Sequence, residues 1–170
     1  MLLKKQAILN HLTTLPKKVL SLHNSEKVSE FVLHDLCAHE CFDLQKAAYL
    51  VDNPDFDCLK GIAGFDAQEA FSADTIWETP ELFIEHMQGA HFNQKVRSIL
   101  KPSSKRSKQS DQEMTQMLGH YLGLPQPTYC SWAMKHDNQG ILIYEAHNSE
   151  LITPDLMTNG ACLLGFCPVY

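Results

Sequence analysis

HDLCAHEC, residues 34–41, and DNPDFDC, residues 52–58, hold the densest group of thiols, imidazoles and carboxylates in the sequence. The apolar spacing around the first stretch predicts a helix over residues 26–41. An alternating hairpin over residues 28–42 also fits, because apolar side chains recur there at every second position. The Asn-Pro pair in the second stretch indicates a turn. These two stretches therefore decide both the predicted fold of the N-terminal half and its candidate chemistry.

The predicted helix brings three metal-ligating side chains onto one face. Each helical residue is rotated about 100° from the one before it, so His34, Cys37 and Cys41, at positions i, i+3 and i+7, point the same way. Two thiolates and an imidazole are three of the four donors of a tetrahedral zinc site, and sulfur also suits iron. We predict a zinc or iron site with these residues, completed by Cys58 or alternatively by His23 or a carboxylate.

A second hypothesis for the same segment is structural. Free cysteine is among the most buried residue types and behaves as a small apolar side chain. On this hypothesis Cys37 and Cys41 belong to the core face of an amphipathic helix, and His34 is a half-buried histidine with a hydrogen-bond partner. The sequence contains no paired Cys-x-x-Cys motifs and no His-Glu-x-x-His motif, which would have favoured zinc more strongly.

An alternative function is thiol chemistry. Cys58 follows a turn and is predicted to open a short element, where backbone N–H groups lower a thiol pKa. The order Cys58, His147, Asp155 matches the nucleophile, base and orienting group of a cysteine-dependent hydrolase or transferase. Asp55 and Asp57 oppose this hypothesis, because neighbouring negative charges raise the pKa of a thiol.

A third hypothesis is a non-enzymatic interaction or regulatory domain, and charge bears on its partners. Residues 1–20 and residues 101–110 each carry four basic side chains and no acidic one, whereas residues 21–100 carry fourteen acidic side chains against five basic ones. A net charge of −6 argues against a broad nucleic-acid surface. We predict residues 101–110 to be a flexible basic loop. We expect a protein partner to bind either through this loop or through the acidic part of the chain, residues 21–100, which we call the acidic body.

The chain is expected to form one α+β domain over residues 1–170, with a mainly helical N-terminal two thirds, a C-terminal antiparallel hairpin and a final strand. Residues 44–51 fit a helix or a strand. The predicted helices span residues 3–13, 26–41, 80–100 and 111–122, the hairpin spans residues 129–134 and 140–144, and the final strand spans residues 161–167.

The cellular compartment follows from what the sequence lacks. No apolar run approaches the roughly 20 residues of a membrane span, and the first residues have no signal-peptide pattern. We therefore expect a cytoplasmic protein whose six cysteines are reduced.

Overall fold

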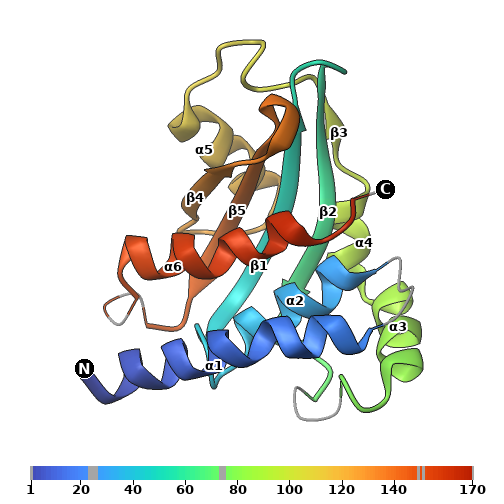
Figure 1. Ribbon diagram of the computed structural model, residues 1–170. Helices are drawn as coiled ribbons and strands as arrows, with labels where there is room; N and C mark the ends of the chain where they lie inside the picture. The colour runs from blue at the N-terminus through green and yellow to red at the C-terminus, as the bar shows by residue number, and fades with distance from the viewer. Residues whose placement is uncertain (1, 23–26, 73–75, 149, 151, 170) are drawn as a thin grey trace.

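A five-stranded antiparallel sheet forms the centre of the computed structural model, which describes residues 2–22, 27–72, 76–148, 150 and 152–169 (Figure 1). Its strand order is β3-β2-β1-β5-β4, and every neighbouring pair is antiparallel. The strands are β1 (Leu44–Asn53), β2 (Cys58–Asp66), β3 (Leu100–Lys101), β4 (Thr128–Ala133) and β5 (Gln139–Ala146).

Helices cover both faces of this sheet. Side chains of β1 alternate between two apolar clusters, with Tyr49 in one and Leu50 in the other. The first cluster lies under α1 (Leu2–Ser21), α2 (Val28–Cys37), α6 (Pro154–Ala161) and the 3₁₀ helix η3 (Cys162–Phe166). The second lies under α4 (His91–Arg97) and α5 (Asp111–Leu122), while α3 (Pro80–Gly89) packs with α2 in a third, smaller cluster through Phe83 and Phe31.

The predicted helical N-terminal two thirds is wrong, because residues 44–53 and 58–66 are the central strands β1 and β2. The reason is that helices bury β1 on both faces, and six consecutive residues from Ala47 to Asp52 are buried. A strand buried on both sides lacks the apolar–polar alternation that reveals a strand in a sequence.

The predicted final strand is also wrong. Residues 161–167 complete α6 and form η3, which packs on the first cluster through Leu164. The predicted helix over residues 80–100 is divided at Ala90, whose extended backbone separates α3 from α4. The hairpin of β4 and β5 is confirmed, as is α5, which begins with a capping box formed by Ser110 and Glu113.

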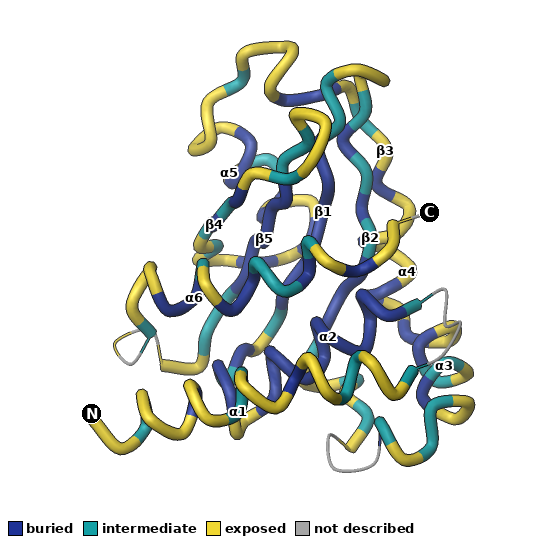
Figure 2. Tube along the Cα trace, viewed as in Figure 1, coloured by how far each residue is buried: buried dark blue, intermediate teal, exposed yellow. Residues whose placement is uncertain are grey.

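Two helices at the N-terminus differ sharply in burial (Figure 2). All ten residues of α2 are buried, whereas Ile8 and Leu15 are the buried residues of the twenty-residue α1. Helix α1 continues past Pro16, beyond its predicted end at residue 13. In the part of the chain that the structure describes, no helix is both long and apolar enough to cross a membrane.

The close approach of α4 to β2 requires glycine at Gly61. A Cβ atom there would lie 1.8 Å from the carbonyl oxygen of Val96, so the helix could not keep its position. We expect Gly61→Ala to lower the free energy of unfolding by about 3 kcal/mol. The matched control is Gly89→Ala at the end of α3, where a Cβ meets nothing within 4 Å and where alanine is favoured by up to about 1 kcal/mol. Urea unfolding of both variants measures the difference, and equal stabilities would contradict this packing.

Candidate functional site

Buried polar side chains of α2 join it to the neighbouring elements. The side chain of Glu30 is 2% exposed, and its Oε1 accepts hydrogen bonds from Arg97 Nη1 at 2.7 Å and from Asn93 Nδ2 at 3.1 Å. Burying a carboxylate is costly unless it is paired and hydrogen-bonded. The Glu30 contacts therefore hold α2 against α4.

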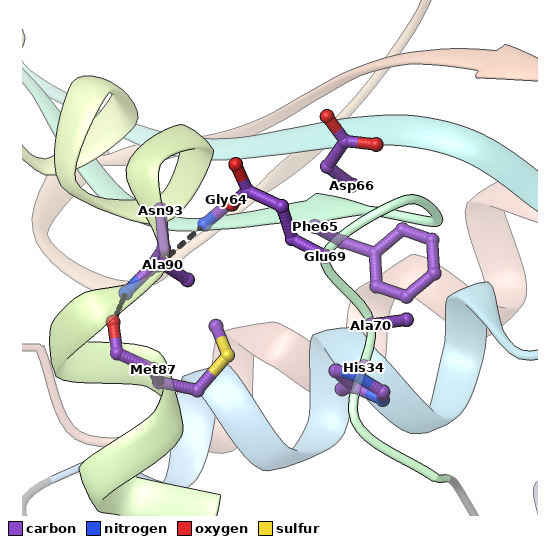
Figure 3. Close-up of a pocket in the computed structure, with 9 residues that line it drawn as sticks. All are labelled: His34, Gly64, Phe65, Asp66, Glu69, Ala70, Met87, Ala90 and Asn93. Atoms are coloured by element: carbon purple, nitrogen blue, oxygen red, sulfur yellow. Dashed lines mark hydrogen bonds between the residues drawn. The ribbon is translucent and has the colours of Figure 1, made fainter.

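Asn93 extends this junction to the sheet (Figure 3). Its Nδ2 also donates to the carbonyl oxygen of Met87 at 3.1 Å, and its Oδ1 accepts from the backbone N–H of Gly64 at 2.9 Å. The last residues of α3, the first turn of α4 and strand β2 thus meet at one side chain. Three of its four hydrogen-bonding positions are used, which is the pattern of a structural residue.

His34 lies beside this junction and is 3% exposed. Its Nε2 accepts a hydrogen bond from the backbone N–H of Phe71 at 3.1 Å, so the proton of the neutral ring is on Nδ1. Burial, together with the nearby His86, lowers the pKa of His34 to about 4. Nδ1 is buried and has no hydrogen-bond partner among the described residues. The imidazole is therefore neutral at physiological pH.

Two hollows lie on either side of His34. The smaller is lined by the residues drawn in Figure 3 and has room for about one water molecule. The larger, of about 770 Å³, is open to solvent, and we call it the histidine cleft. Its lining includes three side chains that the sequence singled out as chemically active: His34, Cys37 and His147.

The rim of the histidine cleft carries the polar groups. His39 Nδ1 lies 3.1 Å from Asp43 Oδ1, and His147 Nδ1 lies 3.2 Å from Gln45 Nε2. The backbone N–H of His147 donates to the carbonyl oxygen of Asp43, which joins the end of β5 to the turn before β1. Polar and apolar side chains thus line the histidine cleft together.

The predicted metal ligands are divided between different environments. Helix α2 ends at Cys37, because Ala38 is extended, so Cys41 lies in the following turn and not on a shared helix face. Burial raises the pKa of Cys37 well above its ordinary value and that of Cys41 to about 12. Within the described ranges, no group of three or more His, Cys, Asp or Glu side chains is arranged to hold a metal ion. The zinc or iron site stays a prediction.

The three residues of the predicted thiol mechanism are far apart. Cys58 pairs with Asn53 at one end of β1, whereas Ala146, next to His147, pairs with Leu44 at the other. Nine residues of extended strand separate these ends by about 30 Å. Asp155 is exposed in the first turn of α6. The structure therefore does not bring Cys58 and His147 into one site.

A feature that the sequence did not reveal lies at the Cys58 end of the sheet. Three loops meet there, and we call them the loop head: residues 54–57, 102–110 and 134–138 (Figure 1, top). Asp57 Oδ1 accepts from the backbone N–H of Ser103 at 3.1 Å, and Lys105 Nζ donates to the carbonyl oxygen of Asp137 at 3.4 Å. The three loops are thus hydrogen-bonded to one another.

Asp52 anchors the basic loop from inside. It is fully buried, and its Oδ2 accepts from Ser104 Oγ at 2.7 Å and from the backbone N–H of Lys105 at 2.9 Å. Ser103 Oγ in turn accepts from the backbone N–H of Arg106. The segment that we predicted to be flexible is therefore hydrogen-bonded at several points. Asp52 and the serine-rich loop are about fifty residues apart, so no local sequence pattern indicates this anchoring.

Backbone strain gathers at the same place. Four of the five non-glycine residues with positive φ in the described chain belong to the loop head, namely Asp57, Lys108, His136 and Asp137. Such conformations cost free energy and are frequent at binding sites, although they identify no ligand by themselves. The loop head thus combines strained backbone with hydrogen bonds between its three loops.

No protein-family model matches the chain, and no curated protein or solved structure is significantly similar to it. The functional argument therefore depends on the geometry described above.

Thiol accessibility gives a test of this geometry. Cys58 is partly exposed, whereas Cys37 and Cys41 are buried. With a pKa of about 12, only about one Cys41 side chain in ten thousand is a thiolate at pH 8. We expect iodoacetamide at pH 8 to label Cys58 first, and Cys37 and Cys41 only after denaturation, as measured by peptide mass spectrometry. Cys58→Ser is the control, and labelling of Cys37 at the rate of Cys58 in the folded protein would contradict this arrangement.

The neutral His34 predicts a loss of stability in acid. Its folded-state pKa of about 4 lies below the ordinary 6.5, so the unfolded chain binds the proton more tightly. Stability is therefore complete above pH 6.5 and falls as the pH falls toward 4. Between pH 7.5 and 5 we expect a loss of about 2 kcal/mol from this residue. Urea unfolding should show that His34→Gln removes this part of the pH dependence, whereas His91→Gln, on an exposed residue, keeps it.

Proposed function

We propose that this protein is a non-enzymatic interaction domain that binds an acidic segment of a partner protein through the loop head. The observation that carries the proposal is the anchoring of the basic loop by the buried Asp52. Lys105, Arg106 and Lys108 are all exposed, and the loop holds them together at one end of a molecule whose net charge is −6.

An anchored loop favours binding because little conformational entropy is lost when the partner arrives. The charges also restrict where an acidic segment can bind. Charges further apart than about 8 Å are largely screened at physiological salt, so the attraction near Lys105 and Arg106 depends mainly on the charges of the loop head itself. There, four basic side chains stand against three acidic ones, Asp55, Asp57 and Asp137. An acidic segment is therefore attracted to the loop head and repelled by acidic surfaces such as that of α3, where Glu81 and Glu85 are exposed.

The buried chemistry supports an interaction domain better than an enzyme. The pKa values of Cys37 and Cys41 are raised by burial, and that of His34 is lowered to about 4. Each of these shifts favours the uncharged form. An uncharged thiol is a weak nucleophile, and an imidazole with a pKa of about 4 is a weak base at neutral pH. Glu30 and Asn93 are likewise committed to holding helices together.

The test uses fluorescence anisotropy with a labelled poly-L-glutamate peptide of about 20 residues at low and physiological salt. We expect the triple variant K105Q/R106Q/K108Q to weaken binding about tenfold or more, because three attractive charges are lost. The control K17Q/K95Q removes two exposed charges outside the loop head and should change affinity less than about twofold. Equal weakening by both variants, or no binding by the unaltered chain, would refute the proposal.

A charge-neutral variant separates loop anchoring from charge. Ser104→Ala removes the hydrogen bond to Asp52 and leaves every exposed cation in place. We expect it to weaken poly-L-glutamate binding severalfold, since a freer loop has more entropy to lose. A single-stranded DNA of equal charge serves as competitor. Preference for the DNA through the same three residues would overturn a protein partner.

A further inference from the structure

Helix α1 is attached to the body along a narrow strip and exposes leucines elsewhere. Leu2 and Leu3 are 87% and 88% exposed. The adjacent Lys4 and Lys5 have no ion-pair partner among the described residues. Residues 1–20 contain no acidic side chain. The N-terminal turns of α1 thus form a basic and apolar surface, which we call the α1 tip.

A surface of the opposite character lies on α3. Leu82 is 54% exposed and stands between the exposed Glu81 and the exposed Glu85 one turn further along the helix. Residues 66–94 contain six acidic side chains and no lysine or arginine. Charge therefore changes sign completely between α1 and this part of the chain.

The α3 surface is also hollowed. An open depression of about 580 Å³ lies between α3 and the segment before it, and Phe71, Leu82 and Gly89 contribute its apolar lining. Glu85 and His86 stand at its edge, with His86 Nε2 donating to the carbonyl oxygen of Glu69. Nothing is packed near Gly89, where an added Cβ would meet no atom within 4 Å. The depression, which we call the α3 hollow, has room for exposed leucine side chains.

The α1 tip cannot reach the α3 hollow of its own chain. The other end of α1 is the one beside α3, because Leu22 packs against the cluster that contains Phe83. Twenty helical residues separate Leu2 from Leu22, a distance of about 30 Å. Figure 1 shows the N-terminus and α3 at opposite ends of the molecule. A contact between the two surfaces must therefore join two molecules.

We infer that two copies of this chain associate by inserting the α1 tip of each copy into the α3 hollow of the other. Leu2 and Leu3 enter the apolar depression, and Lys4 and Lys5 face Glu81 and Glu85. A two-fold axis allows both contacts to form at once, so the assembly closes as a dimer. The occupant is a second copy because this chain itself supplies both the complementary charges and the apolar surfaces.

The test is a charge exchange on the full chain, read by sedimentation equilibrium from low to high micromolar concentration. We expect the unaltered 19.2 kDa chain to form a dimer. The variants K4E/K5E and E81K/E85K should each weaken self-association at least tenfold, because like charges then face each other. An equimolar mixture of the two should form a mixed dimer, since both of its contacts are then between opposite charges.

Control variants distinguish this contact from other effects. K105Q/R106Q/K108Q, altered in the loop head, should dimerise normally, so the inference survives even if the loop head binds no acidic segment. Circular dichroism verifies the fold of each variant. The double variant L2S/L3S should weaken the dimer without changing the charge of the α1 tip. A monomer at the highest concentration, or a mixture that fails to associate, overturns the inference. So does a monomer that binds phosphatidylserine vesicles through Lys4 and Lys5, since the α1 tip would then be a membrane contact.

Discussion

The fold depends on pairing a buried carboxylate. Glu30 has almost no contact with solvent, and its stability as an anion comes from Arg97 and Asn93. Removing one partner of such a pair typically costs about 3–5 kcal/mol, because the remaining charge is left buried without compensation. Asn93 also binds the edge of β2 through Gly64. One carboxylate thereby fixes the positions of α2 and α4 at the edge of the sheet, and with them the walls of both hollows around His34.

Local signals in the sequence predicted the elements that local interactions define. Helix α5 and the hairpin of β4 and β5, both predicted, depend on interactions between residues close together in the chain, such as the capping box of Ser110 and Glu113. They can therefore be recognised without a tertiary structure. Strand β1 could not be found this way, because its two-sided burial comes from helices far along the chain. Gly61 and Gly64 permit the close packing of α4 on β2, a requirement that only the tertiary structure reveals.

Part of the candidate site was predictable from the sequence, because two of its residues lie close together on one helix. Helical spacing placed His34 and Cys37 together, and both line the histidine cleft. It failed for Cys41, because the helix ends at Cys37 and a turn follows. Burial of α2 on every side also removes the distinction between a functional face and a core face, so spacing alone could not separate a metal site from packing. The hydrogen bonds from Asp52 to the basic loop connect residues about fifty positions apart and leave no local pattern.

The separation of charge along the chain becomes a separation in space. The loop head lies at the end of the sheet where β1 meets β2, and the α1 tip projects from the opposite end. Between them lies a sheet buried on both faces, whose polar groups are used for internal contacts. A rigid body of this kind transmits no obvious movement between its ends, since packed cores resist continuous deformation. Binding at the loop head and self-association through the α1 tip should therefore be independent, and a dimer would place two loop heads on one particle. A partner with two acidic segments would then bind more tightly than either segment alone, because the second contact forms within the same complex.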